Sequence, residues 1–145
     1  MRSRVARSHG LVQRVEALIY LDTHVIVWLY ASGKETVPKL ALDRIREDEV
    51  KISPMVRLEL QYLYEIGRVS TPAAVVFDEL AAAIGLSICS QSFPAIVSES
   101  EKQSWTRDPF DRIIVAHAAL SGSTLITKDE TIHRHYPHAC WDQLD

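Results

Sequence analysis

The sequence predicts an α/β fold with a mainly parallel central sheet and helices on both of its faces. Short apolar runs alternate along the chain with longer segments in which apolar residues recur at helical spacing. Alternating strands and helices imply βαβ crossovers, which join parallel strands. The length of 145 residues and the hydrophobic content of 47% suit one compact core. We therefore expect a single domain over residues 17–145.

The first half of the chain is expected to fold as two strand-and-helix units. Ser53 and Pro54 predict a helix start, because serine is a favoured N-cap and proline a favoured first helical residue. Gly67 is the expected end of that helix. The predicted elements are a strand at 17–22, helices at 25–30 and about 38–47, a strand at 50–53 and the helix from Pro54 to Gly67.

The second half continues the alternation. Gly85 and Gly122 are expected to end helices, since glycine readily takes the left-handed conformation that follows a last helical turn. The predicted elements are helices at about 71–84 and 94–103, a helix that follows Asp108 and runs to Gly122, strands at 86–89 and 124–127, and an edge strand near Trp141. Three histidines, His133, His135 and His138, are expected in a terminal loop.

Composition limits the cellular setting. The chain has no apolar run of roughly 18 residues that could span a bilayer, and its N-terminus lacks the apolar segment of a secretory signal. We expect a cytoplasmic protein without a membrane partner. Cys89 and Cys140 match neither a disulfide framework nor a CxxC metal site, so they are expected to be reduced packing thiols.

The charge is unevenly distributed. Residues 1–16 contain four arginines and one glutamate, so 12 of the 16 basic residues but 18 of the 19 acidic residues lie beyond them. The first segment is a mobile basic arm, an artefact of an upstream start or a tail that binds a partner or RNA. The acidic remainder does not exclude a nucleic-acid partner, because carboxylates that gather around metal ions account for part of the excess.

Two acids follow predicted strands. Asp22 closes the apolar run Ala17–Leu21, and Asp129 follows the run from Ser123 to Lys128. In open parallel sheets ligands bind beyond the carboxyl ends of the strands, so both acids could meet in one crevice. Each could instead be a helix N-cap.

Asp108 and Asp111 lie three residues apart at the start of an apolar helical run. The segment Asp-Pro-Phe-Asp has the form of a capping box with Asp108 as N-cap. A carboxylate in the first helical turn can also face the strand ends. We assign the cap to Asp108, which could also lie in the outer shell of the metal or contact a second metal ion. We assign a ligand role to Asp111.

Glu59 has apolar neighbours one helical turn away on both sides. A buried unpaired carboxylate is costly, so Glu59 either snorkels at the margin of the helix or meets a cation. Mg²⁺ and Mn²⁺ prefer oxygen ligands and take one or two carboxylates each. Bound divalent ions can activate water against a phosphodiester, so the acids suggest a metal-dependent phosphodiester hydrolase.

Four segments together closely resemble a PIN-domain ribonuclease of the VapC toxin type. They are Leu-Asp-Thr-His at 21–24, Glu59 in a helix opened by Ser-Pro, Arg-Asp-Pro-Phe-Asp-Arg-Ile-Ile-Val-Ala-His-Ala at 107–118 and Leu-Ile-Thr-Lys-Asp at 125–129. The resemblance covers nearly all of the chain from Leu18 to Trp141. It implies a three-layer α/β/α PIN-like domain.

The resemblance also implies residue roles and partners. Asp22 and Asp111 become metal ligands, and Glu59 becomes a catalytic acid that also contacts metal. Asp108 and Asp129 become supporting acids, and Asp129 is also a candidate metal ligand. The implied activity is Mg²⁺-dependent or Mn²⁺-dependent endonucleolytic cleavage of RNA. The implied partners are a small VapB-type antitoxin and a second copy of the toxin. This chain has Leu58-Glu59-Leu60 where the family often has Trp-Glu-Ile.

For other polar and aromatic residues, both an RNA-contact role and a structural role remain open. Four flank the acids and could contact RNA phosphates, or be surface and structural groups: Arg107, Arg112, Lys128 and Thr127. Four aromatic residues could stack on RNA bases, although core or dimer packing suits most of them: Trp28, Tyr30, Tyr62 and Tyr64. The three C-terminal histidines lack the partner ligands of a recognised zinc finger.

Two other functions fit the acids. An aspartyl-phosphate phosphatase would use Asp22 as nucleophile, although position 24 is histidine where such enzymes generally place a second aspartate. A non-catalytic module would use the acidic groove to receive a basic peptide or helix.

Overall fold

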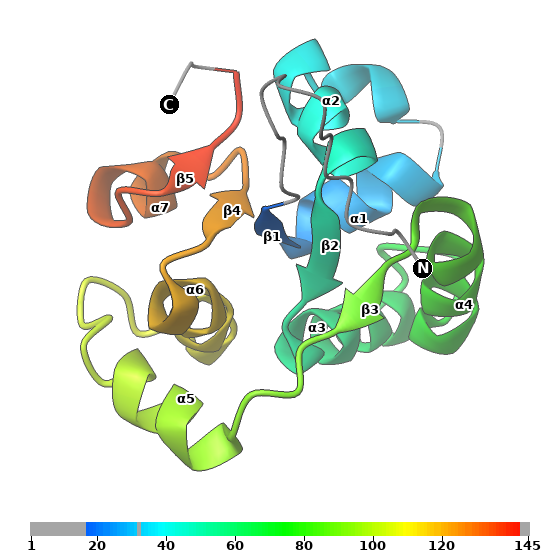
Figure 1. Ribbon diagram of the computed structural model, residues 1–145. Helices are drawn as coiled ribbons and strands as arrows, with labels where there is room; N and C mark the ends of the chain where they lie inside the picture. Colours follow the sequence, from blue (N-terminus) through cyan, green and yellow to red (C-terminus); the bar gives the residue numbers. More distant parts are fainter. Residues whose placement is uncertain (1–16, 32, 143–145) are drawn as a thin grey trace, which may run out of the picture.

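The computed structural model describes residues 17–31 and 33–142, so the predicted basic arm lies outside the described residues. The described residues form a five-stranded sheet in the order β3-β2-β1-β4-β5, and every strand pairs in parallel with its neighbours (Figure 1). The strands are β1 (Leu18–Leu21), β2 (Glu49–Ile52), β3 (Ser87–Ile88), β4 (Thr124–Ile126) and β5 (Ala139–Cys140). The predicted parallel α/β fold is confirmed.

Helices cover both faces of the sheet and give the three layers (Figure 1). The helices are α1 (Thr23–Tyr30), α2 (Lys39–Glu47), α3 (Pro54–Glu65), α4 (Ala73–Ile84), α5 (Phe93–Ser100), α6 (Pro109–Ser121) and α7 (Glu130–His135), with a 3₁₀ turn at Lys34–Thr36. The glycines predicted to end helices do so, and Gly67, Gly85 and Gly122 have φ angles of 79°, 73° and 64°. Among the described residues, none of the helices combines the length and apolar character that a bilayer crossing requires.

The core lies between the sheet and its helices. Ile19 and Leu21 of β1 and Leu125 and Ile126 of β4 are fully buried. Helix α6 contributes a run of six consecutive buried residues, Ile113–Ala118, so it packs as a central helix. This packing fixes the start of α6 relative to the ends of β1 and β4.

The strand order places β1 between β2 and β4, so the chain reverses its direction of travel across the sheet at β1. In doubly wound sheets such a switch point opens the crevice where ligands bind. Leu21 pairs with Ile126 at the carboxyl ends of the two strands. The next residues, Asp22 and Thr127, therefore lie side by side at the mouth of the crevice.

One expectation for the C-terminal segment was wrong. His133 and His135 lie in α7, and only His138 lies in the turn before β5. Asp129 caps α7, because its Oδ1 accepts hydrogen bonds from the backbone N–H groups of Thr131 (2.8 Å) and Ile132 (3.1 Å). The edge strand predicted near Trp141 is confirmed as β5, which ends at Cys140.

The N-cap at Ser53 provides a stability test with a matched control. The buried Ser53 hydroxyl accepts a hydrogen bond from the Met55 backbone N–H at 3.0 Å, whereas Ser92 caps α5 without a side-chain bond. We expect Ser53→Ala to lower the free energy of unfolding by about 1 kcal/mol and Ser92→Ala to change it far less. Urea unfolding of both variants measures the difference, and equal losses would contradict the capping account.

Candidate functional site

Asp22 is anchored at the switch point by three hydrogen bonds. Its backbone N–H donates to the Ile126 carbonyl at 3.0 Å. Its Oδ1 accepts from the Thr23 backbone N–H at 2.8 Å, and its Oδ2 accepts from the Thr127 hydroxyl at 2.7 Å. Asp22 is thus both the N-cap of α1 and a buried acid at the crevice, so a capping role and a role in the site are compatible. The bonds to both oxygens suit a fixed ligand better than a free nucleophile.

Glu59 approaches the same point from α3. It is half-buried, and its Oε1 accepts a hydrogen bond from the Thr23 hydroxyl at 2.5 Å. Thr23 therefore connects the two acids, with its backbone N–H on Asp22 and its hydroxyl on Glu59. The partner of Glu59 is a hydroxyl group at the crevice, so its side chain does not simply reach into solvent.

Asp108 and Asp111 begin α6, and they differ in role as expected. Asp108 is exposed and caps the helix, because its Oδ1 accepts from the Phe110 backbone N–H at 2.8 Å. Asp111 is half-buried in the first turn and has no side-chain hydrogen bond or ion pair among the described residues. An unpaired carboxylate in this position is unfavourable unless a cation joins it.

The five acids influence one another electrostatically. Burial, followed by the charges of Asp108, Asp22, Asp129 and Glu59 in that order, raises the pKa of Asp111 from 3.8 to about 7. Burial also raises the pKa of Glu59, with smaller upward contributions from Asp22 and Asp108. The pKa of Asp22 is raised by burial too, against the opposing hydrogen bonds from Thr127 and Thr23. Acids from four separate segments thus affect one another's pKa values.

The carboxylate oxygens of these acids are the kind of ligand that a divalent cation prefers. Within the described ranges, no group of three or more Asp, Glu, His or Cys side chains is arranged so that it could hold a metal ion. The carboxylates instead repel one another, and this repulsion adds to burial in raising the pKa of Asp111. Bound Mg²⁺ or Mn²⁺ reverses that repulsion and accepts oxygen ligands, so the residues fit such an ion.

The residues considered as RNA contacts occupy different environments. Thr127 is fully buried, and its hydroxyl is engaged with Asp22. Arg112 Nε donates to the Ser100 carbonyl at 3.3 Å and so ties α6 to α5. Arg107 is exposed and donates to the Ser104 carbonyl at 2.8 Å. Lys128 is exposed, with Nζ 5.7 Å from the centre of the Trp28 ring.

Sequence reasoning missed two residues that support the site. Thr23 bridges Asp22 and Glu59, and its only signal was its position directly after Asp22. His133 Nε2 donates to the Thr127 carbonyl at 2.7 Å and so fixes the segment that carries the hydroxyl. Nothing in the spacing of His133 indicated this contact.

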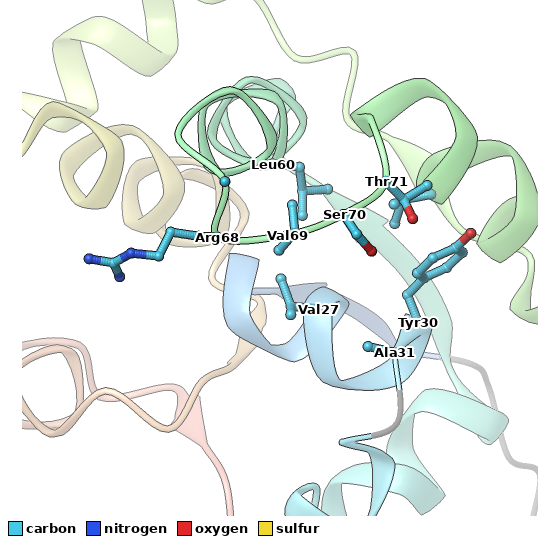
Figure 2. Close-up of a pocket in the computed structure, with 10 residues that line it drawn as sticks. Val27, Tyr30, Ala31, Leu60, Arg68, Val69, Ser70 and Thr71 are labelled. Atoms are coloured by element: carbon cyan, nitrogen blue, oxygen red, sulfur yellow. The ribbon is translucent and has the colours of Figure 1, made fainter.

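An apolar pocket of about 420 Å³ lies away from the acids (Figure 2). Val27, Tyr30 and Ala31 of the α1 segment face Leu60 of α3 across it, and Val69 of the loop before α4 closes it. Arg68 points away from its interior in Figure 2. The pocket suits an apolar side chain rather than a charged substrate.

Comparison with known proteins agrees with this geometry. VapBC2 from Rickettsia felis bound to promoter DNA has a chain with the same fold at 20% identity and a TM-score of 0.59, over 86% of this chain and 99% of that chain. VapBC-1 from Haemophilus influenzae (17%, 0.58, 86% and 97%) and a toxin-antitoxin complex from Klebsiella pneumoniae (19%, 0.56, 86% and 96%) are also similar. Comparison with curated proteins returned no match. The sequence profile of the PIN domain matches residues 19–136, and the chain therefore belongs to the PIN domain family.

Proposed function

We propose that the protein is a metal-dependent endoribonuclease and the toxin of a type II toxin-antitoxin pair. PIN domains are a family of nucleases, and the family assignment covers residues 19–136. The observation that carries the proposal is the half-buried, unpaired Asp111 carboxylate, whose pKa is raised to about 7 by burial and by the charges of four other acids near the switch point. Acids in such a setting are suited to a cation, and a cation suits a phosphodiester substrate.

Asp22, Glu59, Asp111 and Asp129 would hold Mg²⁺ or Mn²⁺, with Asp108 supporting them from the first turn of α6. When bound, the ion supplies polarisation of the phosphoryl oxygen and a lower pKa for attacking water. The Thr127 and Thr23 groups hold both oxygens of Asp22 in a fixed orientation. Burial raises the pKa of Glu59 and makes its carboxylate a stronger base, which suits it to accept the proton of the attacking water.

The test is cleavage of a defined mixture of tRNA, ribosomal RNA fragments and unstructured RNA by protein free of any partner. Reactions contain Mg²⁺, Mn²⁺ or EDTA. We expect discrete cuts with either metal and none in EDTA. Covalent phosphate on Asp22 would favour the phosphatase instead, and tight peptide binding without turnover would favour a binding module.

An antitoxin partner is the second part of the proposal. The similar structures from R. felis and H. influenzae are VapBC complexes, and the Klebsiella structure is a toxin-antitoxin complex. The apolar pocket between α1 and the loop before α4 (Figure 2) offers a place for an apolar side chain of such a partner. Basic groups of the partner would complement the acids.

A homodimer is the third part. Helix α3 exposes Leu58, Tyr62 and Ile66, whose side chains are 56%, 48% and 49% exposed. Phe93 and Val97 of α5 are also exposed, at 65% and 37%. Apolar surface of this kind marks contact between proteins. Sedimentation of the partner-free protein tests the assignment, and the replacement Tyr62→Glu should favour the monomer.

Substitutions at Thr127 test whether its hydroxyl group holds Asp22 in position. We expect Thr127→Val to lower cleavage by about tenfold to a hundredfold, because groups that orient a metal ligand have effects of that size. Thr127→Ser keeps the hydroxyl that donates to Asp22 and should retain most activity. Initial rates under saturating Mg²⁺ measure both variants. Equal losses in the two would show that the methyl group, and not the hydroxyl, matters.

A further inference from the structure

A second pocket, of about 510 Å³, lies against the chain segment that leads into Asp129. It is lined by Lys128, Glu130, His133, Arg134, Trp141 and Asp142. These residues follow β4, belong to α7 or follow β5, three elements that lie together at one side of the sheet (Figure 1). Lys128 stands between Thr127 and Asp129, so the pocket and the acidic site share this segment of the chain.

One wall of the pocket is aromatic and firmly packed. Trp141 is 8% exposed and lies against Trp28, with ring centres 5.7 Å apart and planes at 52°. Lys128 Nζ lies 5.7 Å from the centre of the Trp28 ring, and His24 contacts the same ring with centres 6.0 Å apart. Trp28 lies behind Trp141 and is partly exposed, and an aromatic ring with a cation beside it resembles the surfaces on which proteins receive unpaired bases.

The polar lining carries both signs of charge. Lys128 and Arg134 provide donors, while Glu130 and Asp142 provide acceptors. A site for phosphate alone would be dominated by cations. The edge of an unpaired RNA base presents donors and acceptors side by side, and it pairs with both kinds of side chain. The volume also lies within the range of sites for small ligands.

Two hydrogen bonds through Thr127 connect the lining of the pocket to Asp22. His133 lines the pocket, and its Nε2 donates to the Thr127 carbonyl at 2.7 Å. The hydroxyl of the same Thr127 donates to Asp22 at 2.7 Å. One residue of the chain thus joins the wall of the pocket to an acid of the site. A group held in the pocket would have a fixed position relative to the bond that is cut.

We propose that this pocket holds one unpaired RNA base beside the scissile phosphate and so determines which base the enzyme prefers there. The inference rests on the proposed ribonuclease function. It assigns base preference to Lys128, Glu130, Arg134 and Trp141, residues outside the five acids.

The test uses Arg134→Ala and Lys128→Met, with Arg46→Ala as matched control. Arg134 and Arg46 are both exposed, and each donates one 3.2 Å hydrogen bond to a residue three positions earlier on its own helix. Each variant is made in the full chain with Asp111 intact and again with Asp111→Asn. Binding of four fluorescent single-stranded RNAs, each of one repeated base, is measured with Mg²⁺ on the Asp111→Asn proteins. Cut sites are sequenced for the Asp111 proteins, and thermal unfolding checks the fold of all.

We expect one base to bind best, and Arg134→Ala to weaken that RNA by about tenfold and to flatten the preference at the cut site. Arg46→Ala should match the parent. If the pocket variants bind and cut like Arg46→Ala while the wild type still cleaves RNA, the pocket assignment is overturned and the ribonuclease stands. Loss of antitoxin binding with unchanged RNA affinity would likewise overturn it. A wild type that cuts no RNA overturns both.

Discussion

Replacing Asp111 by asparagine is expected to reduce RNA cleavage by at least about a thousandfold, a loss of roughly 4 kcal/mol of transition-state stabilisation. The reason is the position of this carboxylate. It is half-buried, unpaired among the described residues and subject to repulsion from four other acids. Asparagine has nearly the same size but lacks the negative charge that a divalent cation requires.

The control for this experiment is Asp78→Asn, which removes an exposed acid from α4. It changes the net charge equally and should cleave like the wild type. Both variants should have wild-type circular dichroism. A variant Asp111→Asn that cuts at the wild-type rate would exclude this acid from the metal centre and would remove the main support for the proposed mechanism.

Local signals predicted much of the site. Asp22 and Asp129 were recognised because each follows an apolar strand, and both are helix caps at strand ends. Ser53 and Asp108 were recognised as caps because short-range patterns determine that role, and each accepts a backbone N–H bond. The order of strands and helices followed from hydrophobic periodicity.

Longer-range features could not be read from the sequence. The pKa of Asp111 reflects acids from segments far apart in the chain, so it depends on the packing of β1, α3 and β4 against α6. The bond between Thr23 and Glu59 joins residues 36 positions apart. Helix α7 was missed because it has six residues, half of them basic and two of these histidine, and so short a segment gives little apolar periodicity.

The metal-free protein is expected to become less stable as the pH rises from about 4 to about 7. The pKa of Asp111 is raised from 3.8 to about 7 in the folded protein. Between these pH values the folded protein retains a proton that the unfolded chain has released, so the free energy of unfolding falls as pH increases. Glu59 and Asp22 act in the same direction, because their pKa values are also raised.

Thermal unfolding in EDTA at several pH values measures this effect. Buried His117 opposes it, because burial lowers the pKa of this histidine and the unfolded chain then binds the extra proton. The informative quantity is therefore the difference in slope between the wild type and Asp111→Asn. Asparagine has no proton to lose, so the variant should lose less stability toward pH 8 and should exceed the wild type in Tm there. A wild-type slope equal to that of the variant would contradict the raised pKa.

Mg²⁺ should reverse the loss of stability at high pH, because the ion and the proton compete for the same carboxylates. At pH 8 the acids are ionised and a concentration of one hundred times Kd adds about 2.7 kcal/mol to the free energy of unfolding. At pH 5 Asp111 is largely protonated in the folded protein, since its pKa is about 7, and the same concentration should add much less. The gain should disappear in Asp111→Asn and persist in Asp78→Asn. Stabilisation that is equal at both pH values would place the ion on other groups, because only binding at these acids must displace a proton.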